Sequence, residues 1–147
     1  MRMFAGLLLG LAALSSQPAW AASATMNLSE CLKDHSTGKD RKELVRWIFV
    51  AMSAHPDMRS LTNASEATRL EVSKSAAQLF TRLLTENCAA QTRAAVAQGG
   101  AQGMAEAFRS LGEVAMMELM SNSEVSSAIS TYTQFLDKKK FEAALGK

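Results

Sequence analysis

The sequence predicts an all-α protein, a single-domain bundle of about five helices stapled by one disulfide. No segment of the 147-residue chain alternates apolar and polar residues over the length of a strand, and no Asn-Gly or Asp-Gly hairpin turn occurs. Helix-capping residues recur along the chain instead, followed by apolar residues three and four positions apart. The chain also contains two cysteines, the even count that one disulfide requires.

Residues 1–21 are predicted to be a cleaved signal peptide. Arg2 supplies a positive start, residues 5–14 form an apolar run, and Ala19-Trp20-Ala21 matches the small-x-small pattern that signal peptidase cleaves. The apolar run is shorter than the about 20 residues of a membrane-spanning helix, so we expect no transmembrane anchor after cleavage. Cleavage after Ala24 is the alternative. The protein is therefore expected to be exported by a Sec-type route and to be periplasmic or secreted.

Residues 22–147 are long enough for one α-helical domain with its own core and too short for two. Without Arg2, fifteen basic residues face fourteen acidic ones, which leaves a net charge of +1. This near balance gives no electrostatic reason to expect nucleic acid or an anionic membrane as a partner.

The helices are expected to differ in their burial. The segment from Asp40 to about Ala54 is apolar around most of its circumference, which predicts the central, buried helix of the bundle, ended by Pro56. Polar substitution at Trp47 or Ile48 is accordingly expected to unfold the domain. The five predicted helices start at Asn27, at Asp40, at Asn63, near Met104 after the Gly99-Gly100 break, and after the Ser121–Glu124 break.

Gly112 interrupts the apolar stripe of the fourth predicted helix. A glycine costs about 1 kcal/mol relative to alanine inside a helix, so this position is expected to admit a neighbouring helix at close range.

Two cysteines in an exported chain favour a Cys31–Cys88 disulfide, because thiols oxidise in that compartment. Cys31, Cys88, His35 and His55 also provide the ligand types of a structural zinc site. Zinc sites usually show two close ligand pairs, and Cys88 stands alone in the sequence, so zinc is the weaker alternative.

The methionines have three interpretations. Methionine ordinarily fills irregular gaps in a core, and this is the leading one. Met116, Met117 and Met120 can instead form an adaptable surface for a partner protein. Thioethers also suit Cu(I), so the third interpretation of the methionines is a soft-metal site. Its ligands would be His55, Met52, Met58, Met116 and Met120.

His55 is interpreted mainly as a helix end. It precedes Pro56, which disfavours the α conformation, and a histidine there can hydrogen-bond the last free carbonyl groups of the helix. Ligation and catalysis are the alternatives at this position.

The sequence lacks the GxSxG, HExxH, P-loop and GxGxxG motifs. We therefore expect a protein that is not an enzyme, has no cofactor, and binds another protein of the cell envelope or a small ligand. A soft-metal binder is the alternative. A hydrolase would need a pocket that joins His35 or His55 to carboxylates.

The segments ECLKDHSTGKDRKELVRWIFVAMSAHPDM, LFTRLLTENC and AFRSLGEVAMMELM together resemble small exported α-helical proteins of proteobacteria that have no assigned function. The resemblance implies a periplasmic or secreted setting and supplies no site residues. Inhibitors, immunity proteins and accessory subunits of envelope machines are analogous only in fold.

Overall fold

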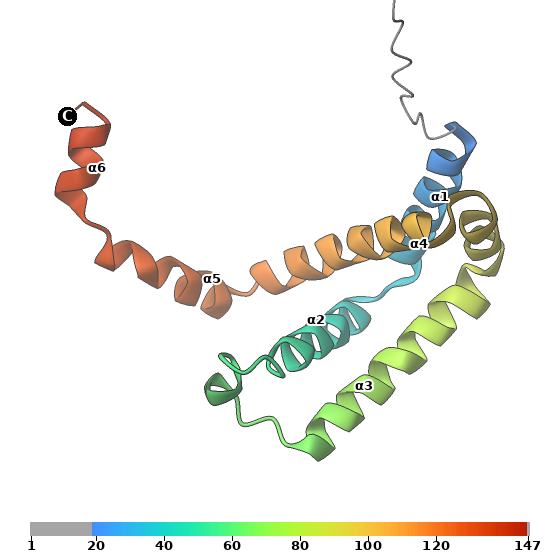
Figure 1. The fold of residues 1–147 in the computed structure, drawn as a ribbon, viewed down its shortest axis with the longest axis horizontal. Helices are drawn as coiled ribbons and strands as arrows, with labels where there is room; N and C mark the ends of the chain where they lie inside the picture. The colour runs from blue at the N-terminus through green and yellow to red at the C-terminus, as the bar shows by residue number, and fades with distance from the viewer. Residues whose placement is uncertain (1–18, 147) are drawn as a thin grey trace, which may run out of the picture.

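The computed structural model describes residues 19–146, which are helical almost throughout (Figure 1). Residues 1–18, with most of the predicted signal peptide, lie outside the described part, and Ala19–Ala21 form the start of the first helix. The elements in chain order are α1 Ala19–His35, α2 Gly38–Met52, η1 Arg59–Leu61, α3 Glu66–Thr81, the π-helical turn η2 Arg82–Asn87, α4 Ala89–Met120, α5 Ser123–Ser130, η3 Thr131–Phe135 and α6 Lys138–Ala144. The predicted all-α domain is confirmed. No helix within residues 19–146 combines the length and hydropathy needed to span a membrane.

The core lies between α1 and α4, which form the most extensive helix pair of the bundle. Leucines at helical spacing on α1 and α4 meet η2 at the centre, and the largest fully buried side chains are Leu28, Leu32, Leu83, Leu111 and Cys88. The buried stripe of α4 is otherwise made of small residues such as Ala95, Ala107 and Ala115, which let α1 approach closely.

The prediction that residues 40–54 form the central helix is wrong. In α2 only Leu44 and Val50 are buried, whereas Phe49 is 58 % exposed and Met52 is 63 % exposed. An edge-to-face contact from Trp47 to Phe80 of α3, with ring centroids 5.6 Å apart, holds one side of α2. Part of its apolar surface is exposed, since within residues 19–146 α2 packs mainly against α3 and α4.

Several helix starts also differ from those predicted. Asn27 lies inside α1, since the alanine-rich segment before it continues the helix towards the N-terminus. The capping box of α2 is formed by Thr37 and Asp40, so Asp40 is the third helical residue and not the cap. Ser65 caps α3 in place of Asn63.

Asp40 also joins α2 to the π-helical turn by an ion pair with Arg82, at 2.8 Å between nitrogen and oxygen. Burial raises the pKa of the Asp40 carboxyl, but hydrogen bonds from Thr37 and the charge of Arg82 outweigh it, so the pKa lies below its ordinary value.

The predicted break at Gly99-Gly100 is confirmed: the helical backbone is interrupted at Gly100, where two helical segments that together form α4 meet at a kink. Gly100 has φ +55° and ψ −146°, a conformation that side-chain-bearing residues rarely adopt, and α4 resumes after it. The kink divides α4 into a first part, which starts at the disulfide, and a second part, which runs beside α2 (Figure 1).

Gly103→Ala should lower the free energy of unfolding by about 1–3 kcal/mol, the usual cost of overpacking. An added Cβ would lie 2.7 Å from Thr25 Oγ1 and 3.3 Å from the carbonyl oxygen of Ala95. Urea denaturation measures the loss, and adding Thr25→Ala should restore part of it. The control is Gly112→Ala, where a Cβ meets no atom within 4 Å and the helix should gain up to about 1 kcal/mol. Equal effects at the two glycines would contradict the close α1–α4 crossing.

Beyond α4 the chain forms a C-terminal arm, residues 121–146, which extends away from the bundle (Figure 1). Within the described residues, α5 packs only against the end of α4 and against η3, and α6 packs against no other element. Almost every residue of the arm is exposed, and apolar residues are among them: Ile129, Tyr132, Phe135, Leu136, Phe141 and Leu145.

Candidate functional site

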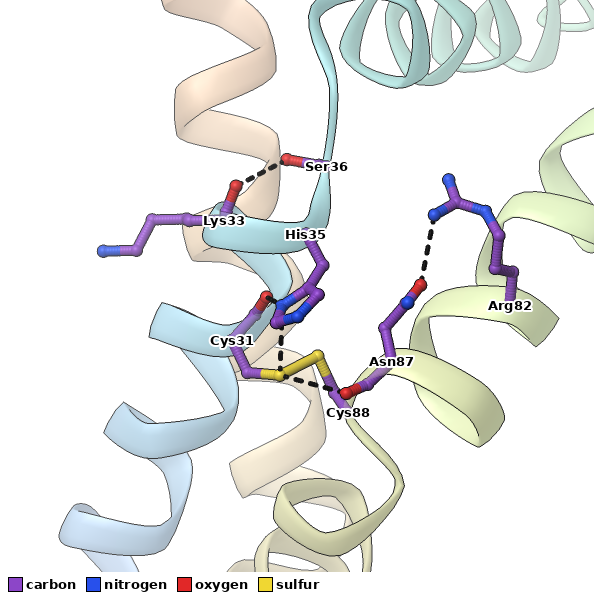
Figure 2. Close-up of a disulfide and its surroundings, with 7 residues drawn as sticks. All are labelled: Cys31, Lys33, His35, Ser36, Arg82, Asn87 and Cys88. Carbon is purple, nitrogen blue, oxygen red and sulfur yellow. Dashed lines mark hydrogen bonds between the residues drawn. A yellow bond between two sulfur atoms is a disulfide. The ribbon is translucent and has the colours of Figure 1, made fainter.

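The Cys31–Cys88 disulfide is present, as predicted, and joins the last part of α1 to the junction of η2 and α4 (Figure 2). The sulfur atoms are 2.08 Å apart and the Cα atoms 5.9 Å apart. Both cysteines are buried within the core cluster. The Cys88 N–H donates to the carbonyl oxygen of Leu83, which closes the wide π-helical turn just before the bridge.

His35 lies one turn after Cys31, and its ring faces the disulfide (Figure 2). Its Nδ1 is 2.9 Å from the carbonyl oxygen of Cys31 and 3.6 Å from Cys31 Sγ. Because a carbonyl oxygen only accepts, Nδ1 carries the proton in this arrangement, and Nε2 is left as the free acceptor. The ring therefore closes the C-terminal turn of α1 beside the sulfur atoms.

Three of the four residues proposed for zinc come together here. The ligand atoms of Cys31, His35 and Cys88 all lie within 4.8 Å of one another. His55, the fourth, lies beyond the end of α2 and is absent from this group. Zinc binds thiolates, and both sulfurs are bonded to each other, so the cluster in its disulfide form offers only the imidazole as a ligand.

The structure places His55 at an exposed turn after α2. Its Nδ1 accepts a hydrogen bond from the N–H of Asp57 at 3.3 Å and lies 3.8 Å from the Asp57 carboxylate. The side chain therefore holds the turn around Pro56 rather than the last carbonyl groups of α2, which is a different role from the one predicted.

The methionines are mostly exposed, so the leading prediction of core filling is wrong for Met52, Met116 and Met117. Met52 and Met58 line one small hollow at the end of α2, of about 100 Å³. Met52 also lines a larger groove with Met116. His55 and Met120 line neither, so the residues proposed for copper are not gathered around one hollow.

That larger groove, the α2/α4 groove, lies between α2 and the second part of α4. It has a volume of about 400 Å³. Its walls are apolar, with Val45, Phe49 and Met52 from α2 and Met116 and Leu119 from α4. Sequence reasoning found Met116 as a surface residue and missed Phe49, because an apolar residue on a helix that is apolar all round is ordinarily taken as core.

Gly112 lies in the floor of the groove and also lines a second hollow of about 320 Å³ beneath α2, between Trp47, Phe80 and Phe108. Gly112 is predicted to admit a neighbouring helix at close range. No helix of the described chain lies against it, since a Cβ there would meet no atom within 4 Å. The glycine lines open space.

The rim of the groove is basic. Lys42 and Arg46 line it, and neither forms an ion pair with an acidic residue of the part of the chain that the structure describes. The acidic residues nearby on α4 are already paired, Glu113 with Arg109 and Glu118 with Arg41. The site therefore combines an apolar floor with two unpaired positive charges.

Comparisons of this chain with protein-family models, with curated proteins and with solved structures found no match. The chemistry of the groove and of the disulfide cluster is therefore the basis for assigning a function.

Proposed function

We propose that the chain is an exported, non-catalytic binding module that holds an apolar helix of another protein in the α2/α4 groove. The observation that carries this proposal is the groove itself, an uncovered apolar channel between two helices. Large contiguous apolar surfaces on soluble domains are typical of interaction sites. A groove between helices is suited to the apolar face of an amphipathic helix.

The side chains of the groove support a protein as the ligand. Phe49 offers an exposed aromatic ring, and Met52 and Met116 offer flexible thioethers that can adjust to a partner's surface. The unpaired Lys42 and Arg46 favour a partner helix with acidic residues at its edges. An inhibitor, an immunity protein or an accessory subunit of the cell envelope has this mode of action.

We also propose that the chain is exported. Export is supported by the signal-like residues 1–21 and by the Cys31–Cys88 disulfide, which persists in oxidising compartments. A partner in the periplasm or outside the cell is therefore expected.

Site-specific photo-crosslinking tests the groove. A benzophenone amino acid placed at Met116 in the exported chain should give one defined adduct with another protein after irradiation in its own cells. The matched control is the same amino acid at Met117, which is more exposed than Met116 but does not line the groove, and should give little adduct. The mass of the adduct separates another protein from a second copy of this chain.

A second substitution measures the energetic role of the groove. Phe49→Asp should lower the yield of the Met116 adduct at least about tenfold, because the partner loses an aromatic contact worth more than about 1.4 kcal/mol when fully buried, and the new carboxylate offsets the positive charge of the rim. Since Phe49 is mostly exposed in the free chain, the variant should fold normally. Equal adduct from positions 116 and 117, or adduct insensitive to Phe49→Asp, would count against the proposal.

A further inference from the structure

The C-terminal arm exposes an apolar surface that the bundle does not cover. Val125, Ile129 and Tyr132 follow one another on one face of α5 and its continuation, and Phe135 beyond them is 82 % exposed. A short amphipathic helix gains most of its stability from packing that face, so an arm without a packing partner is incomplete.

We infer that the arm of one chain occupies the α2/α4 groove of a second copy, and that two copies exchange arms to form a symmetric dimer. The inference rests on the groove of the proposed function and names the segment that fills it when no other protein is bound. Each chain then contributes one arm and one groove, and this reciprocal arrangement closes at two copies.

The junction between α4 and α5 directs the arm away from its own groove. Asn122 caps α5 by accepting hydrogen bonds from the N–H groups of Glu124 and Val125, at 2.9 and 3.1 Å. Ser121 Oγ donates to the carbonyl oxygen of Glu118 at 2.7 Å. These bonds fix the direction of the arm, which packs against neither α2 nor α3. Filling its own groove would require the chain to break this cap.

The dimensions of the arm suit the groove. The α2 wall, from Lys42 to Met52, is about 15 Å long at the rise of an α-helix. The segment Ser123–Phe135, helical throughout, is about 20 Å long and can span it. Gly112 leaves open space in the floor, where a helix from outside can approach the α4 backbone closely.

Charge favours the same occupant. Between residues 121 and 136 the arm has one charged residue, Glu124, near its start. Beyond that segment Asp137 pairs with Lys140. The rim of the groove has the bases Lys42 and Arg46, which are unpaired within the described residues. A nearly uncharged helix with one acidic residue therefore meets apolar walls with a basic rim.

The segment Ser123–Phe135 offers apolar area for a dimer. Tyr132 and Phe135, both mostly exposed, each offer about 150–250 Å² when fully buried. Val125, Ile129 and the apolar walls of the groove add to this area, and the exchange makes the contact twice, towards the roughly 800 Å² per partner that a stable interface buries.

Light scattering coupled to size exclusion tests the exchange on the processed chain. The wild type should have the mass of a dimer. Phe135→Asp should weaken self-association at least about tenfold, because the seated arm loses a phenylalanine side chain whose full burial is worth more than about 1.4 kcal/mol. Gln134→Asp makes the same charge change at the neighbouring residue and should leave the dimer intact.

The groove variant is Gly112→Leu, whose Cβ meets no atom within 4 Å and whose side chain should fill the open space of the groove. It should be monomeric and more stable, since leucine is a better helix former than glycine. The control is Ala105→Leu, which adds a leucine at an exposed position of α4 outside the groove. Mixing the Phe135→Asp and Gly112→Leu chains should restore a heterodimer, in which one intact arm occupies one intact groove.

Three outcomes would overturn the inference. If the wild type is monomeric at high micromolar concentration, the arm does not occupy the groove of a second copy. A dimer that survives Gly112→Leu but not Phe135→Asp shows that arms pair with arms. A mixture of the two variants that stays monomeric shows that arm and groove do not meet.

If the chain is monomeric while the Met116 crosslink to another protein still forms, the exchange fails and the proposed function stands. If a dimer forms as expected and that crosslink is absent, the proposed function fails alone.

Discussion

Replacing Cys31 and Cys88 together by alanine should lower the free energy of unfolding by roughly 4 kcal/mol. The bridge closes a loop with a sequence separation of 57, and the loop-closure entropy of an unfolded chain of that length gives this magnitude. A domain of this size is stable by about 5–15 kcal/mol in total, so the loss is a large part of it. Alanine is the right replacement, because a serine hydroxyl would be buried at both positions.

Chemical denaturation of the wild type, the wild type in dithiothreitol and the double-alanine variant measures this effect. Reductant should move the wild type towards the variant and leave the variant unchanged. Equal unfolding free energies for wild type and variant would show that the packing of α1 on α4 holds the fold without the bridge.

Leu32→Ala should cost about 2–5 kcal/mol, because Leu32 is fully buried between α1 and its neighbours and its removal leaves a cavity. The comparison is Ile48→Ala in α2. Ile48 is only partly buried and lines the open hollows, so less contact is lost there and the cost should be smaller.

This order is the opposite of the one expected if α2 were the central, buried helix, as the sequence predicts when it expects polar substitution at Trp47 or Ile48 to unfold the domain. Thermal and urea unfolding of the two single variants distinguish the orders. A larger loss for Ile48→Ala would make α2 the centre of the core after all. The measurement therefore tests the placement of the core and not only the stability of one residue.

Much of the fold follows from the sequence because its signals are local or covalent. The chain has two cysteines, the even count that one internal disulfide requires, and capping residues identify helices within a few positions of their ends. The errors at helix starts have a local cause as well. Asn27 has the spacing of a cap, but the alanines before it extend α1, and helix propensity over several residues outweighs one capping bond.

The groove could not be predicted for a different reason. A helix that is apolar around most of its circumference is expected when its own bundle surrounds it, and it is also expected when one side packs against a partner protein. The residues of α2 are the same in both cases, and only the three-dimensional arrangement shows that Phe49 and Met52 face open space. The arm has the same ambiguity, because the stripe of Val125, Ile129 and Tyr132 does not specify which surface covers it.

The disulfide also makes part of this protein a covalent ring. The backbone from Cys31 to Cys88 and the bridge between them enclose α2, η1 and α3, while α4 leaves the ring at Cys88. The connection between α2 and α3, residues 53–65, is largely exposed. One peptide bond cleaved there opens the ring but does not divide the molecule, because one fragment keeps Cys31 and the other keeps Cys88. The nicked protein would remain a single covalent unit until a reductant separated its two pieces.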